Sequence, residues 1–214
     1  MTSISNAPAP RSGAGARLAN LVVDPVTAFR GIAVDPSWKL ALLAAVGIRF
    51  GSLFIFYQPA ITPIKLLGGL LIQILTVGPT VFFASLVAWL AARAWRVNVA
   101  WITALAILMH VYVAFTLATV AFASVAGALL PNSMDIDLRN PPFTNPSALL
   151  GRTDSEVFRT LAGEIDVRSV YVLVLLWLGL RGAAPHAPRS VVAAILLTIV
   201  VVRVTGVVAV LLLH

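Results

Sequence analysis

Three ionisable residues lie inside long apolar stretches of the sequence. Arg49 and Arg203 each stand near the middle of a stretch long enough to cross a membrane, and His110 stands at a similar depth in a third. An arginine at the centre of a bilayer costs about 2.5–3.5 kcal/mol on insertion scales, so such a residue is a functional candidate by default. One interpretation is therefore an intramembrane basic pocket, built by these three side chains, for a phosphate, a carboxylate or an anionic lipid.

A structural role is the simpler interpretation of the same residues. Either arginine could bond backbone carbonyls at a helix kink, or form an ion pair with Glu164 or Asp166 if an apolar helix begins there. A lone histidine in a membrane helix often only hydrogen-bonds a neighbouring helix. The sequence leaves the two interpretations open.

Residues for catalysis or metal binding do not occur in a recognised arrangement. The chain has no cysteine, which excludes disulfides, zinc-thiolate sites and thiol catalysis. No two of His110, His186 and His214 have metal-ligand spacing, and no glycine loop could hold a phosphate. Asp135 and Asp137 lie in a polar stretch without a partner for acid–base work. We therefore expect a protein that is not an enzyme and uses no metal and no cofactor.

The composition predicts a membrane protein. Of the 214 residues, 60% are hydrophobic and 11% are charged, whereas soluble domains have about 45–50% apolar and about 25% charged residues. A single core of this size cannot bury the excess, but a bilayer removes the need for a wet surface. The net charge of +7 comes from scattered Lys and Arg, without the basic stripe that predicts nucleic-acid binding.

Five apolar stretches are predicted to form an all-α bundle of transmembrane helices. A helix needs about 20 residues to cross about 30 Å of hydrocarbon. The fourth apolar run, 169–180, is too short alone, so it must extend through 165–167, tuck into the bundle or be re-entrant. The expected spans are approximately 38–57, 66–92, 101–130, 165–181 and 191–213.

The segments before and between the spans are predicted to be polar or interfacial. Residues 1–17 have the composition of a disordered tail, and residues 18–35 are expected to lie on the cytoplasmic membrane surface as a mildly amphipathic segment. No cleavable signal peptide is expected, so the first span would act as a signal-anchor. A polar loop, 131–164, would lie outside, with a short helix over 154–161 predicted by the capping-box spacing of Thr153 and Glu156.

Two Asp-Pro pairs predict helix starts, at Asp24-Pro25 and at Asp35-Pro36, where the second pair would open the first span. The carboxylate of such a pair caps free backbone amides, and the proline occupies a position whose amide needs no partner.

Basic residues predict the orientation, because cytoplasmic loops are enriched in Lys and Arg. If the N-terminal tail is inside, the cytoplasmic segments contain only Asp24 and Asp35 as acids, and the outside segments contain six acids. We therefore expect a cytoplasmic N-terminus, an outside C-terminus and five spans. The basic residues on the cytoplasmic side would be Arg11, Arg17, Arg30, Lys39, Arg93, Arg96, Arg181 and Arg189.

Two glycine-containing features concern helix packing. Gly47 and Gly51 have the small-residue spacing that lets helices approach closely. The expected neighbour is another helix of this chain, although a second copy stays open. Gly78-Pro79 in the second span predicts a kink and is a candidate hinge.

Several of these landmarks occur together in one protein family. They are LVVDPVTAFR at 21–30, DPSW at 35–38, the short hairpin between the second and third spans, and IDVRSVY at 165–171 leading into Gly179-Leu180. In this pattern the chain resembles the Yip (Ypt-interacting protein) family of five-span membrane proteins, above all its bacterial branch, from about residue 18 to the end. The family commonly has a bulky aromatic where Tyr171 stands, so the last motif fits only in part.

The resemblance implies a non-enzymatic, multi-pass protein of the bacterial inner membrane. Eukaryotic members are associated with small GTPases and vesicle traffic, a property that we do not carry over to a chain of bacterial composition. Our first hypothesis is a scaffold or adaptor that binds another membrane protein. Its rivals are a small transporter or lipid-handling protein that uses Arg49, His110 and Arg203, and an accessory subunit of a larger complex. The expected partners are the bilayer, another membrane protein or complex, and an anionic lipid, with no nucleic acid.

Overall fold

The computed structural model describes residues 13–57, 62–129, 162 and 166–212, and every element within these ranges is a helix. The expected all-α fold is therefore confirmed for this part of the chain. The predicted loop 131–164, its short helix and Glu164 lie outside the described residues, as do residues 1–12 of the predicted tail. The helices are α1 (Ala14–Val23), α2 (Pro25–Val34), α3 (Lys39–Tyr57), α4 (Pro63–Ala94), α5 (Trp101–Leu129), α7 (Val167–Ala183) and α8 (Arg189–Leu212).

Within the described ranges, five helices, α3, α4, α5, α7 and α8, occupy the stretches in which spans were expected. Within the described residues, α4 and α5 are long and apolar enough to cross a membrane. The two helices differ in burial: 22% of the most apolar window is buried in α4, but 56% in α5. Helix α4 therefore turns most of its apolar side chains outward, whereas α5 turns more than half of them toward other helices.

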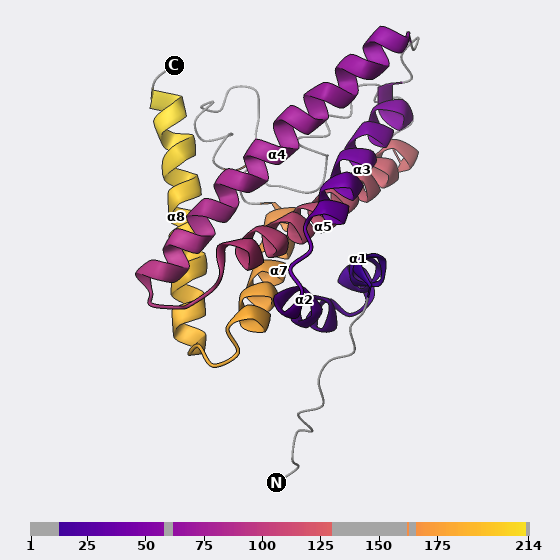
Figure 1. Ribbon diagram of the computed structural model, residues 1–214. Coiled ribbons are helices and arrows are strands. Elements are labelled where there is room, and N and C mark those ends of the chain that lie inside the picture. Colours follow the sequence, from indigo (N-terminus) through magenta and orange to yellow (C-terminus); the bar gives the residue numbers. More distant parts are fainter. Residues whose placement is uncertain (1–12, 58–61, 130–161, 163–165, 213–214) are drawn as a thin grey trace.

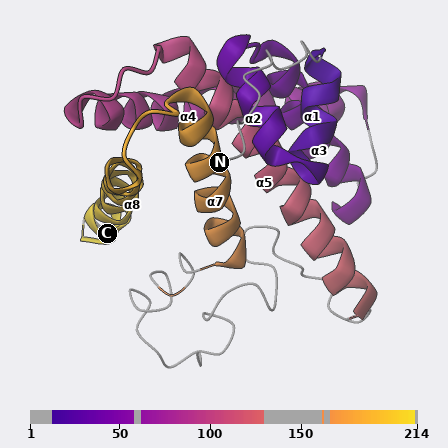
Figure 2. The ribbon, with the colours of Figure 1, turned by 90° about the horizontal axis from the view of Figure 1, so that it is seen from below.

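Helix α5 is the centre of the arrangement, because it packs against α1, α2, α3, α4 and α7. Helices α3 and α4 form a hairpin on one side of α5, and α4 runs in the direction opposite to α3 and α5 (Figure 1). Helix α8 packs against α4 and α7. The short helices α1 and α2 lie together beside one end of α3, as Figures 1 and 2 show.

The first helices contain more packed structure than the sequence predicted. The disordered tail was expected to reach residue 17, but α1 begins at Ala14 and Arg17 is only 3% exposed. Residues 18–35 were expected to lie on the cytoplasmic membrane surface, and that placement stays a prediction. Leu21, Phe29 and Ile32 of this segment are buried in a cluster with residues of α5 and α7. Local composition did not indicate these contacts, because their partners are distant in the sequence.

The two Asp-Pro pairs behave differently. Asp24 caps α2 as predicted: its Oδ1 accepts the backbone N–H of Thr27 at 3.2 Å, and Pro25 is the first helical residue. The prediction for Asp35-Pro36 is wrong, because α3 begins only at Lys39. Asp35 instead ends α2, where its N–H donates to Gly31 O at 3.0 Å. The carboxylate of Asp35 is engaged by a side chain of α1.

Close helix packing occurs at glycines other than the predicted pair. A Cβ added to Gly47 or Gly51 would meet no atom within 4 Å, so the close contact expected within the chain is absent from the described structure. By contrast, a Cβ on Gly179 would lie 2.5 Å from Ile107 Cγ2, and a Cβ on Gly182 would lie 3.2 Å from the Phe29 backbone. Helix α7 therefore meets α2 and α5 through two glycines three residues apart.

Helix α4 continues through Gly78-Pro79 from Pro63 to Ala94. A proline inside a helix removes one backbone hydrogen bond to the residue four positions earlier. A Cβ on Gly78 would meet no atom within 4 Å, so this glycine is not required for packing among the described residues. The hinge at this position stays a prediction.

Candidate functional site: polar groups buried among the helices

Three contacts of charged side chains join one described helix to another. The first joins α1 to the end of α2, the second joins α3 to α5, and the third joins the start of α7 to α5. Charged groups withdrawn from water are tolerated when they are paired and hydrogen-bonded. The three contacts differ in how far this condition is met.

The contact at the start of α7 is an ion pair between Asp166 and Arg168, whose side chains are 4% and 5% exposed. Asp166 caps α7, because its Oδ1 accepts the backbone N–H of Arg168 at 2.7 Å. Its Oδ2 accepts Nε–H and Nη2–H of the Arg168 guanidinium, the first at 2.7 Å. One carboxylate therefore both starts the helix and neutralises the arginine.

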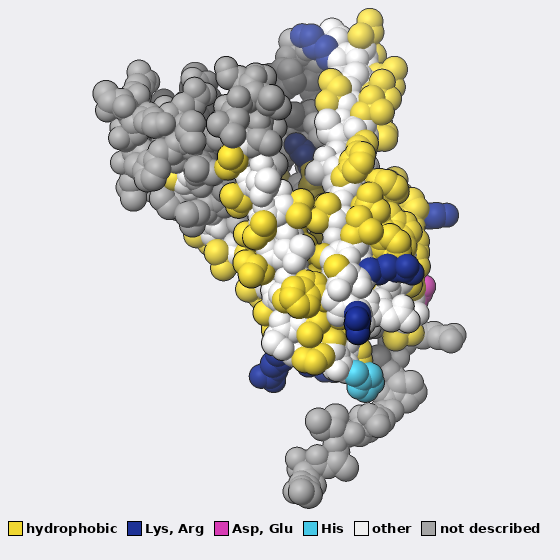
Figure 3. Space-filling model, turned by 90° about the vertical axis from the view of Figure 1, so that its left-hand side faces the viewer, with side chains coloured by type: hydrophobic (Ala, Val, Ile, Leu, Met, Phe, Trp, Pro, Cys, Tyr) yellow, Lys and Arg dark blue, Asp and Glu magenta, His cyan; other side chains and the backbone are white. Residues whose placement is uncertain are grey.

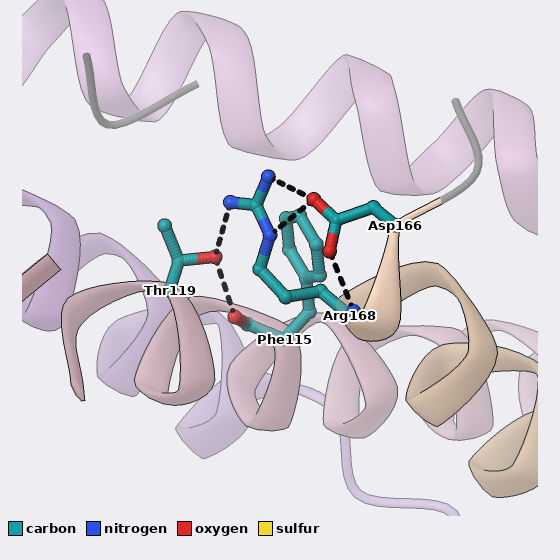
Figure 4. A network of polar contacts seen from close by, with 4 residues as sticks. All are labelled: Phe115, Thr119, Asp166 and Arg168. Atoms are coloured by element: carbon teal, nitrogen blue, oxygen red, sulfur yellow. Dashed lines mark hydrogen bonds and ion pairs between the residues drawn. The ribbon is translucent and has the colours of Figure 1, made fainter. Parts of the chain in front are cut away.

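The same guanidinium also contacts α5 (Figure 4). Nη1 donates to Thr119 Oγ1 at 3.3 Å, and Thr119 Oγ1 in turn donates to Phe115 O at 2.9 Å. The Arg168 Cζ lies 5.6 Å from the centroid of the Phe115 ring, in range of a cation–π interaction. This network connects α7 to α5 with its charges balanced. We call it the α5–α7 junction.

The α5–α7 junction changes the prediction for Asp166. The sequence offered Asp166 as a partner for Arg49 or Arg203, but the structure gives it Arg168. The sequence signal for this pair is an arginine two residues after a capping aspartate. At that spacing the guanidinium can fold back and bind the aspartate carboxylate.

The first contact is an ion pair between Arg17 and Asp35. Arg17 Nη2 lies 2.6 Å from Asp35 Oδ2, and Arg17 Nη1 donates to Asp35 O and to Gly31 O, the latter at 3.3 Å. Arg17 Nε is buried without a hydrogen-bond partner. These bonds cap the last carbonyls of α2, and they explain why α1 extends to residues of tail-like composition.

His110 is buried on the face of α5 that meets α1 and α2. It is 1% exposed, its Nδ1 lies 2.8 Å from Ala106 O on its own helix, and Ala106, Ile107 and Val111 beside it belong to the cluster that contains Leu21 and Phe29. The histidine therefore faces the N-terminal helices and is bonded to the backbone of α5. The bond to a neighbouring helix that the structural interpretation expected is not the one observed, because Ala106 belongs to the same helix as His110.

The second contact involves Arg49, which is partly exposed. Its Nη1 donates to the hydroxyl of Tyr112 on α5 at 2.5 Å, and its backbone carbonyl accepts the hydroxyl of Ser52 at 2.7 Å. In the part of the chain that the structure describes, no carboxylate forms an ion pair with Arg49. Arg49 thus differs from Arg17 and Arg168, each of which has an aspartate.

The structure does not bring Arg49, His110 and Arg203 into one pocket. Residues 110 and 112 of a helix are separated by about 200° around its axis, so Arg49 beside Tyr112 meets a different face of α5 from His110. Arg203 is exposed on α8, a helix that packs against α4 and α7, and it has an interaction of its own there. No contact between the described residues joins the three side chains, so the three-residue pocket stays a prediction.

Helix register places Gln73 of α4 at about the level of Arg49 and Tyr112. An apolar cluster of α3, α4 and α5 includes Ala45, Val77 and Met109. Arg49 is one turn after Ala45, Tyr112 is one turn after Met109, and Gln73 is one turn before Val77. Because α4 runs opposite to the other two helices, all three steps lead toward the same end of the bundle (Figure 1).

Gln73 is 8% exposed, and its Oε1 is buried without a hydrogen-bond partner. A buried polar atom without a partner costs about 1–3 kcal/mol. We call Arg49, Gln73 and Tyr112 the polar layer. The sequence pointed to Arg49 but missed Tyr112 and Gln73, because which face of each helix meets the others was not known.

The described residues contain no group of three or more His, Cys, Asp or Glu side chains that could hold a metal ion. Comparisons with protein-family models, with curated proteins and with solved structures find no match to this chain. The resemblance to the Yip family therefore stays a prediction.

Proposed function

We propose that the chain is a non-enzymatic, multi-pass protein of the bacterial inner membrane that acts as a scaffold, an adaptor or an accessory subunit. In this proposal α3, α4, α5, α7 and α8 each cross the bilayer, with the N-terminus in the cytoplasm. The protein would act by holding another membrane protein or complex against its lipid-facing or cytoplasmic surface.

The observation that carries this proposal is the exposed apolar surface of α4. Soluble monomers rarely expose large contiguous apolar patches, whereas lipid tails solvate such side chains without cost. Figure 3 shows hydrophobic side chains over much of the face on which α8 lies. The exposed large apolar residues of α4 are Ile64, Leu66, Leu67, Leu71, Ile72, Ile74, Leu75, Phe82, Phe83 and Leu90.

The short helix α7 is compatible with crossing. Its 17 residues span about 26 Å at 1.5 Å per residue, somewhat less than the hydrocarbon thickness. Its first charges, Asp166 and Arg168, are buried against α5 and neutralise one another. A helix that begins with a neutralised and buried pair can start within the membrane boundary without exposing a charge to lipid.

A role in binding rather than catalysis is supported by how the buried charges are used. Arg17 and Arg168 are each engaged by an aspartate and bond to backbone or side-chain groups of the bundle. Their bonds stabilise helix ends and helix contacts. The resemblance to the Yip family points in the same direction.

Membrane insertion and topology test the first part of the proposal. Reporter fusions within 132–149 should report the outside face, and fusions near Ala184 should report the cytoplasmic face. Wild-type protein that stays monodisperse in buffer without detergent would overturn the membrane assignment, and a cytoplasmic signal from 132–149 would overturn the five-span topology.

Purification in mild detergent tests the second part. Mass spectrometry of the purified protein should find one partner protein in a fixed ratio to this chain. The same purification of a Leu71→Arg variant tests whether the exposed face of α4 is the binding surface. Less of the partner protein should then be recovered than with the wild-type chain. A wild-type preparation that contains only this chain would contradict the scaffold and subunit roles.

A further inference from the structure

We propose that the polar layer binds a phosphate group, with Arg49 as the cation that holds it and with Tyr112 and Gln73 as its hydrogen-bonding neighbours. The phosphate could belong to a phospholipid headgroup drawn in from the adjacent leaflet, or could be free phosphate. This inference rests on the proposed membrane insertion of α3, α4 and α5.

The charge of Arg49 is the first argument. An arginine guanidinium is always protonated in proteins, and it is rare in the middle of a membrane helix without a partner or a functional reason. The two arginines that are buried in the described helices, Arg17 and Arg168, each form an ion pair with an aspartate. Arg49 has only the neutral hydroxyl of Tyr112 among the described residues. We therefore infer that a bound anion supplies the negative charge that the described residues do not supply to Arg49.

The unused hydrogen-bond donors of the polar layer are the second argument. A guanidinium has five N–H groups in a planar fork that matches two oxygens of a phosphate, and the bond to Tyr112 uses one of them. Because the Tyr112 oxygen accepts that bond, its own proton is free to donate to a phosphate oxygen. No nitrogen of Arg49 is both buried and unbonded, so the remaining donors are reachable from the surface of the bundle.

Gln73 supplies an independent observation. Its Oε1 is buried with no partner, and a glutamine amide offers two donors on one side and an acceptor on the other. This oxygen is buried, so a headgroup meets it once the Gln73 amide turns toward Arg49; a hydroxyl or an ammonium group beside the phosphate then satisfies the oxygen, while the phosphate binds Arg49. A headgroup of this kind, such as that of phosphatidylglycerol or phosphatidylethanolamine, therefore fits the polar layer better than a simple anion.

The depth of the polar layer is compatible with a headgroup drawn inward. Arg49 lies eight residues before the end of α3, about 12 Å along the helix axis. A long arginine side chain can extend toward the nearer interface, and a phosphate can move inward to meet it. The expected lipid is therefore one from the leaflet on the side where α3 ends and α4 begins.

The test compares retained lipid in the wild-type chain with that in single variants. Each protein is reconstituted into nanodiscs of phosphatidylglycerol and phosphatidylcholine, extracted into a lipid-free detergent and analysed by native mass spectrometry. Wild-type protein should retain one phosphatidylglycerol. Arg49→Gln should lower that retention about 10- to 100-fold, the range expected for a lost charge-assisted contact, whereas Tyr112→Phe and Gln73→Leu should lower it about three- to tenfold.

Arg203→Gln is the matched control, because it removes an arginine from a membrane stretch outside the polar layer, and it should retain lipid as the wild-type chain does. Arg49→Lys keeps the charge and should keep part of the binding, so it reports on the site if Arg49→Gln fails to fold. A second arm adds inorganic phosphate to delipidated protein. Protection against thermal unfolding that depends on Arg49 in this arm alone would assign the site to free phosphate.

Equal lipid retention by folded wild-type, Arg49→Gln and Arg49→Lys proteins, together with no effect of phosphate, would overturn the proposal. Failure of the membrane assignment is separable from this outcome. It would be seen in the wild-type chain itself, which would then stay in solution without detergent before any lipid is measured.

Discussion

The α5–α7 junction and the polar layer are two places where an arginine of one helix bonds α5, one with an acidic partner and one without. At the α5–α7 junction, the chain supplies its own counter-charge two residues away, and Arg168 bonds Asp166 and Thr119. At the polar layer, the described chain supplies a neutral phenol for Arg49 and leaves the oxygen of Gln73 without a partner.

The difference indicates how structural and functional charges can be distinguished in one bundle. A balanced pair stabilises helix ends, and loss of one member leaves an uncompensated buried charge. A cation without an acidic partner gains little from its surroundings, so its removal should cost little stability and should instead change what the protein binds.

Asp166→Ala is expected to give the largest loss of stability. It removes the Asp166 carboxylate from the buried Arg168 guanidinium and removes the cap of α7, and breaking a buried pair costs about 3–5 kcal/mol. Unfolding in mixed micelles of mild detergent and sodium dodecyl sulfate would measure this loss. The double variant Asp166→Ala/Arg168→Met should recover part of it, because the guanidinium is then removed together with the carboxylate that it binds. A loss smaller than about 1 kcal/mol for the single variant would contradict this prediction, because exposed ion pairs on a protein surface contribute that little.

Gly179→Ala should destabilise the protein by about 1–3 kcal/mol, the range for overpacking in a well-packed core. The added Cβ would lie 2.5 Å from Ile107 Cγ2, so α5 or α2 would have to move. Gly47→Ala is the matched control, since no atom lies within 4 Å of its added Cβ, and it should be neutral or slightly stabilising because alanine favours helix. The same unfolding assay measures both variants, and equal effects would contradict the packing assigned to Gly179.

Apolar runs and proline positions were enough to predict the long helices, because helix length and apolar content are local properties of the sequence. The ends of α3, α4, α5, α7 and α8 lie within about three residues of the expected spans. The cap at Asp24 was also predictable, because its carboxylate binds an amide three residues away. Patterns of this kind need no knowledge of tertiary contacts.

Contacts between distant segments were not predictable in the same way. Asp35 resembles a helix start in sequence but binds Arg17 of another helix, and the close glycine contact occurs at Gly179 rather than at Gly47. The partners of Arg49 depend on which face of α5 meets α3, and a short apolar helix pattern does not specify that face. The sequence therefore indicated which residues could carry function but not which of them would meet.

Arg49→Gln is expected to change the free energy of unfolding only slightly, in contrast to Asp166→Ala at the α5–α7 junction. The variant loses one hydrogen bond to Tyr112, worth about 1 kcal/mol, but it also removes a charge from α3, the first of the proposed spans. We expect a change in the free energy of unfolding within about 1 kcal/mol, measured in delipidated detergent by the same assay. A loss as large as that of Asp166→Ala would mean that Arg49 has a structural counter-charge, and it would remove the distinction between the two sites.

Asp24→Asn should give the smallest effect, and it extends the comparison to a fully solvated charge. The hydrogen bonds from Thr27 to the exposed carboxylate lower the pKa of Asp24 from its usual value of 3.8. The lowered pKa contributes stability that is present above 3.8 and is lost as the pH falls through the folded-state value. Asparagine keeps a capping oxygen but does not titrate. When the pH is lowered from about 5 to about 2, the free energy of unfolding should therefore fall less for the variant than for the wild-type chain. Parallel pH profiles for the two proteins would show that this cap does not depend on its charge, in contrast to the buried pair at the start of α7.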